Sequence, residues 1–280
     1  MKIKPVFFSL IILLTSCEDV IEIELNYMEP KLVIEGVIND FDNQCIIKLS
    51  KTTDYFNKKT NPPVSDAVIT LTDNEGTIVN LNETEPGIYL NKSVQTKPNI
   101  NYTLNIHTEG DEYVAKATIP QKVNIDSLTY KYNPESMIYE VGYVVSCHFS
   151  DPGEFRNFYR LKTYNINDIT QAKNSKDIYN DDLFNGNKVE LPWSYDVYQE
   201  LDTVVVELYT LDVQTYDYYK TLFSISGGEE MMSMTTPANP NTNINNGALG
   251  YFGAYTISRD TIIIAPSNKI DKLNKLRSNY

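Results

Sequence analysis

The sequence predicts an all-β protein, in which an N-terminal β-sandwich is followed by a second, mainly β domain with one short helix. Short runs of alternating apolar and polar residues recur between turn residues along most of the chain, which is typical of sandwiches and barrels. Only one internal segment carries apolar residues at helical spacing.

Residues 31–120 carry the clearest strand pattern. Residues 67–72 read AVITLT, residues 73–76 supply a turn, and residues 102–107 alternate as YTLNIH. Tyr113, Ala115, Ala117 and Ile119 then fall on one face of a further strand. This order of strands is similar to the immunoglobulin- or transthyretin-like, carboxypeptidase-regulatory module. We therefore expect residues 31–120 to form an independent sandwich that ends at Pro120.

Residues 121–265 are expected to form the second β domain. The pattern predicts strands at 125–132, 140–149, 158–164 and 203–211, and a last hairpin at 251–258 and 260–265. Residues 165–188 are rich in Asn, Asp and Lys, which predicts a long excursion. The helix is predicted at 213–224, where Val213, Tyr216 and Phe223 recur near helical spacing before a Gly227-Gly228 cap.

Residues 1–16 have the pattern of a secretory signal peptide. Lys2 and Lys4 precede an apolar stretch that is too short to span a bilayer as a helix. The signal ends in Leu14-Thr15-Ser16-Cys17, which resembles the bacterial lipobox, so Cys17 is the expected lipid attachment site. Residues 17–30 would then be a lipidated tether. Removal of the signal takes away two lysines and changes the formal charge from −13 to −15.

The residues after Cys17 bear on location. An Asp directly after the cysteine, the usual signal for retention in the inner membrane, is absent, because Glu18 stands there. Glu18 and Asp19 together resemble the acidic surface-export signal of Bacteroidota lipoproteins. We expect an outer-membrane protein that is anchored by its acyl chains and faces the cell exterior.

Residues 266–280 form a basic polar tail. Ile270, Leu273 and Leu276 recur every three residues among its lysines. A short amphipathic helix and a solvated, frayed terminus are both open interpretations.

The composition also excludes several classes of function. A formal charge of −13 would repel nucleic acid. With 2 His and 3 Cys, the chain has few residues that could serve as ligands of a His- or Cys-based metal site. Cys45 and Cys147 lie in separate strand-like runs, which favours two buried thiols over a disulfide. Cys147 and His148 point to opposite faces of a strand, so they cannot form a catalytic dyad with each other. We therefore predict no catalytic residue, cofactor or metal.

A polar turn near residue 186 offers hard oxygen ligands from two aspartates and two asparagines: Asp181, Asp182, Asn185 and Asn187. The spacing departs from the EF-hand calcium loop, because Leu and Pro occupy positions where ligands would be needed. The sequence therefore favours a turn that closes a hairpin.

Two aromatic groups are candidates for a ligand or partner surface: Trp193, Tyr195 and Tyr198, and, after the Asn-rich loop 237–250, Tyr251, Phe252 and Tyr255. Tyrosine with asparagine is adaptable binding chemistry. The competing interpretation is packing, with Tyr251 and Tyr255 against the predicted helix. Ser127, Thr203 and Thr261 each follow an Asp at a strand start and are candidate O-glycosylation sites, although Asp-Ser/Thr also suits a turn that leads into a strand.

Several spaced motifs point to a family. Cys17 is followed by EDVIEIEL, residues 30–36 read PKLVIEG, residues 125–128 read IDSL, residues 182–186 read DLFNG, and residues 240–255 read PNTNINNGALGYFGAY. These motifs resemble the uncharacterised Bacteroidota lipoproteins of domain-of-unknown-function family 4249. The resemblance implies an outer-membrane lipoprotein encoded beside TonB-dependent receptors, with no assigned activity.

The expected function is that of a non-catalytic accessory to a TonB-dependent transporter, which captures or presents an oligosaccharide or peptide ligand. A structural subunit of an outer-membrane assembly is the alternative. An enzyme acting on polysaccharide or peptide is the third possibility.

Overall fold

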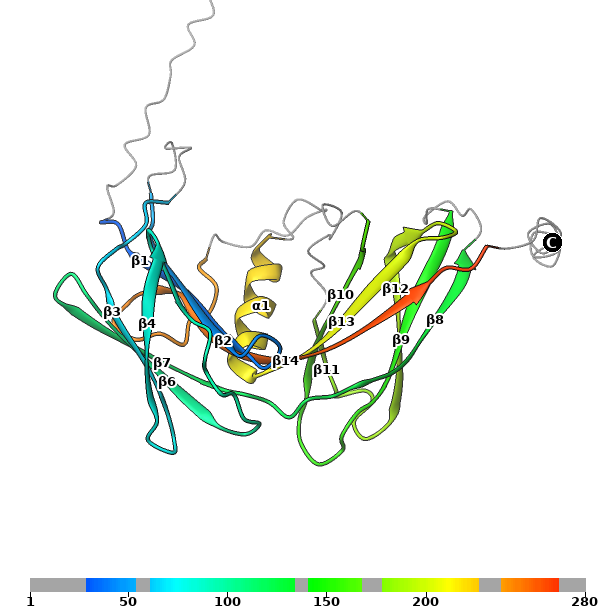
Figure 1. Cartoon of the computed structure of the whole chain (residues 1–280), viewed down its shortest axis with the longest axis horizontal. Coiled ribbons are helices and arrows are strands. Elements are labelled where there is room, and N and C mark those ends of the chain that lie inside the picture. Colours follow the sequence, from blue (N-terminus) through cyan, green and yellow to red (C-terminus); the bar gives the residue numbers. More distant parts are fainter. Residues whose placement is uncertain (1–28, 54–60, 134–140, 168–177, 227–237, 267–280) are drawn as a thin grey trace, which may run out of the picture.

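The structure is a computed structural model that describes residues 29–53, 61–133, 141–167, 178–226 and 238–266. Over these ranges the chain is mainly β with one helix, α1 (Val213–Ser226), which confirms the predicted class. The strands form two halves that meet at the long strand β14 (Leu249–Ile263). Helix α1 lies over this junction (Figure 1). Cys17, the tail and the Gly227-Gly228 cap lie outside the described residues.

The first half is a two-layered sandwich. One layer runs β14-β1-β2-β5 and the other runs β3-β6-β7; strand β4 joins both, because its residues 78–81 pair with β3 and its residues 82–85 with β5. Ile34, Ile47 and Leu104 belong to the core between the layers. The strands are β1 (Leu32–Asn39), β2 (Gln44–Lys51), β3 (Val68–Asp73), β4 (Ile78–Glu85), β5 (Ile88–Asn91), β6 (Asn101–Thr108) and β7 (Asp111–Thr118).

The second half is also a sandwich. A layer of order β11-β10-β13-β14 faces a three-stranded layer of order β12-β9-β8, and Phe149, Tyr159 and Leu208 lie in the core between them. Helix α1 packs on the outer side of the first of these layers, through a separate cluster that contains Phe158 and Tyr216. The strands are β8 (Ile125–Asn133), β9 (Gly142–Ser150), β10 (Phe158–Asn165), β11 (Ile178–Asn180), β12 (Lys188–Tyr198) and β13 (Thr203–Leu211).

Strand β14 links the two halves. Its residues 249–255 run parallel to β1, and its residues 255–263 run antiparallel to β13. The predicted hairpin at 251–258 and 260–265 is therefore wrong, since these residues form one continuous strand. The expectation that residues 31–120 form an independent sandwich is also wrong, because Phe252 and Ala254 of β14 belong to the core of the first half.

The expected excursion at 165–188 contains a short strand, and a strand that was not predicted follows it. Residues 178–180 form the short strand β11, and β12 begins at Lys188. The sequence pattern missed β12 because Pro192 lies in it. Proline is tolerated there because β12 is an edge strand that pairs with β9 and with no other strand of the described residues.

The two cysteines in the described residues are separate, as predicted. Cys45 is buried in the core of the first half and Cys147 in that of the second, and both are free thiols. Burial raises the pKa of Cys147 to about 12, so the thiol stays protonated. No helix in the described part of the chain is long and apolar enough to cross a membrane.

Candidate functional site

Two of the three predicted aromatic residues of β14 are buried, so the prediction that they contribute to a ligand or partner surface is wrong for Tyr251 and Phe252. Tyr251 and Phe252 are 7% and 0% exposed. The Tyr251 ring stacks on Tyr218 of α1 with centroids 4.1 Å apart, and its hydroxyl lies 3.0 Å from that of Tyr219. Burial raises the pKa of Tyr251 well above its ordinary value. The packing interpretation of Tyr251 is confirmed.

The other predicted aromatics do not gather with them on one surface. Phe252 points to the opposite face of β14 and packs in the core of the first half. Tyr255 is half-buried against Tyr209, with ring centroids 5.2 Å apart. Tyr198 is buried and donates a hydrogen bond to the Thr163 hydroxyl at 2.6 Å. The side chains of Trp193 and Tyr195 lie outside the described residues.

The Asn-rich loop covers the edge strand β7. The backbone N–H of Asn245 donates to Val114 of β7, and the Asn245 side chain accepts from the Val114 N–H at 2.7 Å. The Asn243 amide donates to the carbonyl of Lys116, the next outward residue of β7. Asn243 and Asn245 thus satisfy backbone groups that an edge strand would otherwise expose to strand addition. The alternation of asparagines at 243 and 245 was the signal for this role, and the sequence interpretation missed it.

The candidate glycosylation residues all lie in the second half. Ser127 and Thr261 are exposed and Thr203 is half-buried. The Asp202 carboxylate accepts a hydrogen bond from the Gln199 N–H at 2.7 Å, which closes the turn before β13. At Thr203 the preceding Asp therefore has the turn role that the alternative interpretation gives it.

The polar turn at 181–187 is a structural brace. The carboxylate of Asp181 is buried and accepts from the Asn157 N–H at 2.7 Å, and Asp182 pairs with Arg156 at 3.0 Å. Within the described residues, no group of three or more His, Cys, Asp or Glu side chains is arranged to hold a metal ion.

The two histidines lie on outer strand faces. His148 Nε2 is 2.8 Å from the Thr129 hydroxyl, on the face of β9 opposite the buried Cys147. His107 is 3.8 Å from Glu112, and both side chains are more than half exposed. The Cys147-His148 pair therefore lies on two faces, as predicted.

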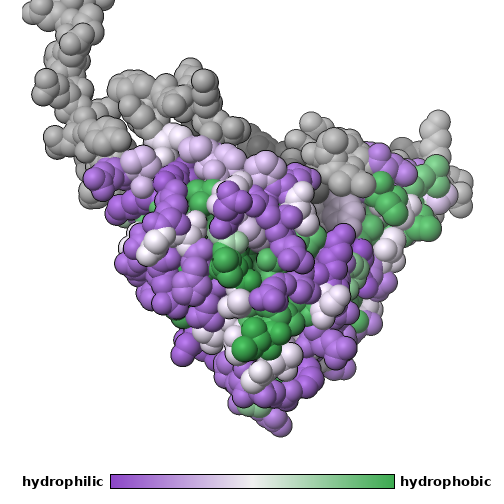
Figure 2. Space-filling view, turned by 60° about the vertical axis from the view of Figure 1, so that its left-hand side comes forward, coloured by the Kyte–Doolittle hydropathy of each residue, from purple (hydrophilic) through white to green (hydrophobic). Residues whose placement is uncertain are grey.

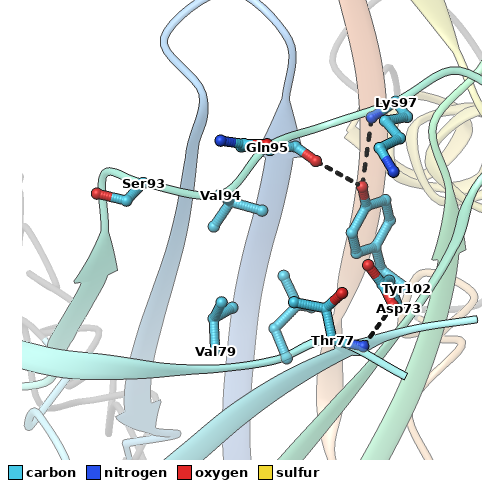
Figure 3. A pocket seen from close by; sticks show the side chains of 9 residues that line it. Asp73, Thr77, Val79, Ser93, Val94, Gln95, Lys97 and Tyr102 are labelled. Atoms are coloured by element: carbon cyan, nitrogen blue, oxygen red, sulfur yellow. Dashed lines mark hydrogen bonds between the residues drawn. The ribbon is translucent and has the colours of Figure 1, made fainter. Parts of the chain in front are cut away.

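A cavity of about 200 Å³ opens at one end of the first sandwich (Figure 3). Its apolar floor comes from Leu71 of β3, Val79 of β4 and Val94 of the segment before β6. Polar side chains surround this floor, and they come from the β3–β4 turn, the segment 93–97 and β6: Asp73, Thr77, Ser93, Gln95, Lys97 and Tyr102. The cavity thus combines three apolar side chains with a larger number of hydrogen-bonding groups, so its lining is more polar than that of most small-ligand pockets.

The polar ring of the cavity is held in place by backbone contacts. Asp73 accepts hydrogen bonds from the N–H of Thr77 at 2.7 Å and of Glu75 at 3.0 Å. The Tyr102 hydroxyl donates to the Gln95 carbonyl and accepts from the Lys97 N–H, both at 3.3 Å (Figure 3). The loop from 93 to 97 is therefore fixed to β6 by a nearly buried tyrosine.

Both charges at the cavity persist at neutral pH. The hydrogen bond from the Thr77 N–H, more than any other contact, lowers the pKa of Asp73. The Glu75 carboxylate, 2.5 Å from the Lys97 ammonium, raises the pKa of Lys97. The cavity therefore presents a carboxylate and an ammonium together with amide and hydroxyl groups.

Figure 2 shows the first half from one side: its surface is mostly hydrophilic, with hydrophobic residues gathered in the middle.

The model of a family described as Domain of unknown function (DUF4249) matches residues 18–261 of this chain. No curated protein matches the sequence. A crystal structure of the chicken CNTN1 FN1–FN3 domains is similar over 64% of this chain and 60% of that chain, with 9% sequence identity and a TM-score of 0.25. This chain thus spans about 60% of the length of that structure, and a likeness this weak carries no argument.

Proposed function

Because the chain belongs to the DUF4249 family of domains of unknown function, we propose a function for it from its own residues. It is a non-catalytic lipoprotein, anchored at Cys17 in the outer membrane, that captures an oligosaccharide or peptide and presents it to a TonB-dependent transporter. The cavity between Asp73 and Lys97 is the observation that carries the ligand-binding part of this proposal. The lipobox at Cys17 carries the part that concerns location.

The size of the cavity limits what it can hold. A volume of about 200 Å³ corresponds to roughly six or seven water molecules. This is less than the several hundred Å³ of a pocket for a drug-sized ligand. One sugar ring or one amino-acid residue of a longer chain fits it, while the remainder of the ligand stays in solvent.

The chemistry of the lining suits such a residue. The carboxylate of Asp73 and the amide of Gln95 accept from hydroxyl or ammonium groups, and the Lys97 ammonium donates to hydroxyl or carboxylate groups. Hydrogen bonds with charged groups are stronger than neutral ones. The apolar floor excludes water from one side of the ligand, which adds to its affinity.

A binding measurement tests this part of the proposal. The full-length protein in detergent is screened against arrays of oligosaccharides and short peptides, and hits are measured by titration calorimetry. Lys97→Gln removes the ammonium and should weaken binding about tenfold or more, in line with a lost charged hydrogen bond. Lys92→Gln is the matched control, because Lys92 is an exposed lysine outside the cavity lining. Equal affinities of the two variants, or no binding by the unmodified protein, would refute ligand capture at this cavity.

A further inference from the structure

The cavity lies at the end of the first half that is opposite the entry of the chain into β1. Tyr102 lines the cavity at the start of β6 and pairs with Asp73 at the end of β3. Beyond the other end of β6, Glu109 forms an ion pair at 2.6 Å with Lys51, the residue that pairs with Leu32 at the start of β1. Strand β6 has 8 residues, and at about 3.3 Å per residue roughly 25 Å separates its two ends. A ligand therefore reaches the cavity from the side away from the tether.

The charges around the cavity do not cancel. The carboxylates of Asp73 and Glu75 and the ammonium of Lys97 all act electrostatically on the hydroxyl of Tyr102, which lines the cavity. Two negative charges against one positive charge leave one negative charge in excess. Glu75 and Lys97 form an ion pair with each other at 2.5 Å, so the excess charge is that of Asp73.

Asp73 has capacity for a donor group of a ligand. The N–H groups of Glu75 and Thr77 both donate to the same carboxylate oxygen, Oδ1. A carboxylate has about four acceptor positions, so a position remains open even with the Thr77 hydroxyl as a third donor. The Asp73 side chain is half-buried, and partial removal from water strengthens its attraction for a cation. The charge of Asp73 therefore selects a positively charged group.

The remaining lining suits a peptide better than a sugar. An ammonium has three N–H donors, and the hydrogen bond of Lys97 to Glu75 uses one of them, so Lys97 can also donate to a peptide carbonyl. The aromatic ring of the lining belongs to Tyr102, which is 3% exposed. This ring presents no open face on which the apolar side of a sugar ring could stack.

We propose that the cavity binds a peptide through a primary ammonium group, which the Asp73 carboxylate holds while Lys97 donates to a carbonyl of the same peptide. This rests on the proposed function and narrows its ligand from an oligosaccharide or peptide to a peptide. The ammonium is that of the first residue or of a lysine side chain, and both are mainly protonated at pH 7. An acidic residue would meet the excess negative charge and is disfavoured.

A matched pair of ligands tests the charge requirement. Triglycine amide carries a terminal ammonium, and its glycolyl analogue carries a hydroxyl in the same place. In titration calorimetry with the full-length protein in detergent, at pH 7 and low salt, triglycine amide should bind at least about fivefold more tightly than the analogue. Equal affinities would overturn the proposal.

Two further ligands in the same assay identify the source of the ammonium. Nα-acetyllysine amide offers only a side-chain ammonium, and glucosamine offers the ammonium of an amino sugar. Tighter binding of Nα-acetyllysine amide than of triglycine amide would assign the site to a lysine side chain, which the proposal includes. Tighter binding of glucosamine than of both peptide ligands would overturn it.

Asp73→Asn removes the charge and keeps the turn, because the amide oxygen still accepts from the Glu75 and Thr77 N–H groups. The preference for triglycine amide over its analogue should disappear in this variant. Asp111→Asn is the matched control, since Asp111 is an exposed aspartate at the other end of β6, and it should retain the preference. Melting curves check that both variants fold, and the ligand comparison on the unmodified protein needs neither variant. A preference that persists in folded Asp73→Asn would contradict the proposal.

Failure of ligand capture gives a different result. If an oligosaccharide from the arrays binds and depends on Lys97, but the ammonium preference is absent, ligand capture stands and this inference alone fails. If neither the arrays nor the peptide ligands bind, both fail.

Discussion

The side chain of Asn243 pairs with the backbone of Phe252 as a neighbouring strand would. The Asn243 amide donates to the Phe252 carbonyl at 2.7 Å, and its oxygen accepts from the Phe252 N–H at 3.0 Å. This edge of β14 lacks a strand partner at residue 252, because pairing with β13 begins only at residue 255. One asparagine thus satisfies two backbone groups at the junction of the two halves, where an unpaired group would be costly.

Asn243→Ala should therefore destabilise the protein. It removes the partners of the Phe252 N–H and carbonyl, and each unsatisfied group costs about 1–3 kcal/mol when water cannot replace the partner. For a chain of this size the melting temperature falls by about 2–4 °C per kcal/mol. Calorimetric or circular-dichroism melting checks this against Asn241→Ala, which changes an exposed side chain of the same loop. Equal melting temperatures for the two variants would contradict a bracing role.

Local pattern was sufficient to predict the β class and the helix. The alternation in residues 102–107 and the spacing of Val213, Tyr216 and Phe223 are set by short-range periodicity, and both elements are present within two residues of the expected bounds. Alternation also placed Tyr251 and Tyr255 on one face of a strand. It could not tell that α1 would cover that face, since this depends on tertiary packing.

Long-range partners explain what the sequence could not predict. The predicted hairpin turned at Arg259, but the strand continues there, where Arg259 pairs with Glu207 of β13 and its Nε donates to the buried Glu207 carboxylate at 2.9 Å. The candidate cavity shows the same limit. The turn at Asp73 was predicted, while Lys97 and Tyr102 meet it only after the loop before β6 folds back.

Gly253 should tolerate no side chain while Thr215 faces it. A Cβ at Gly253 would overlap the Thr215 hydroxyl under the first turn of α1. We expect Gly253→Ala to cost about 1–3 kcal/mol of unfolding free energy, as overpacking typically does. Adding Thr215→Ala removes the overlapping hydroxyl and should restore part of the loss in a double-mutant cycle. Strict additivity of the two substitutions, measured by denaturant unfolding, would show that this contact is not the cause.

Replacement of Cys17 should release the protein from its membrane. Acyl chains on Cys17 are the proposed anchor, and lipid attachment supplies about 0.8 kcal/mol of membrane affinity per buried CH₂ group. Cys17→Ser should therefore give an unprocessed or soluble species in cell fractionation, whereas Cys45→Ser should still fractionate with the outer membrane. If the Cys17→Ser protein remains with the outer membrane, another attachment exists and the proposed anchor is wrong.

Asp212 should make the stability of the junction depend on pH. Its carboxylate accepts from the Thr215 N–H at 2.9 Å, as an N-cap of α1, and from the Thr118 N–H of β7 at 3.3 Å. Burial, the largest influence, raises the pKa of Asp212 from 3.8 to about 6. The folded state therefore binds a proton more readily than the unfolded state. The stability from this proton is fully present below about pH 4 and is lost as the pH rises through 6.

Asp212→Asn isolates this effect, because the amide keeps an acceptor for the Thr215 N–H but does not titrate. Between pH 5 and 7, the unfolding free energy of the unmodified protein should fall by about 1 kcal/mol relative to that of the variant. Urea unfolding at several pH values measures the difference directly. The variant's absolute stability is a separate matter, since its NH₂ group faces the Thr118 N–H and loses that hydrogen bond at every pH. Parallel pH profiles for the two proteins would mean that Asp212 is already ionised at pH 5 in the folded state, and that the junction does not respond to pH through this residue.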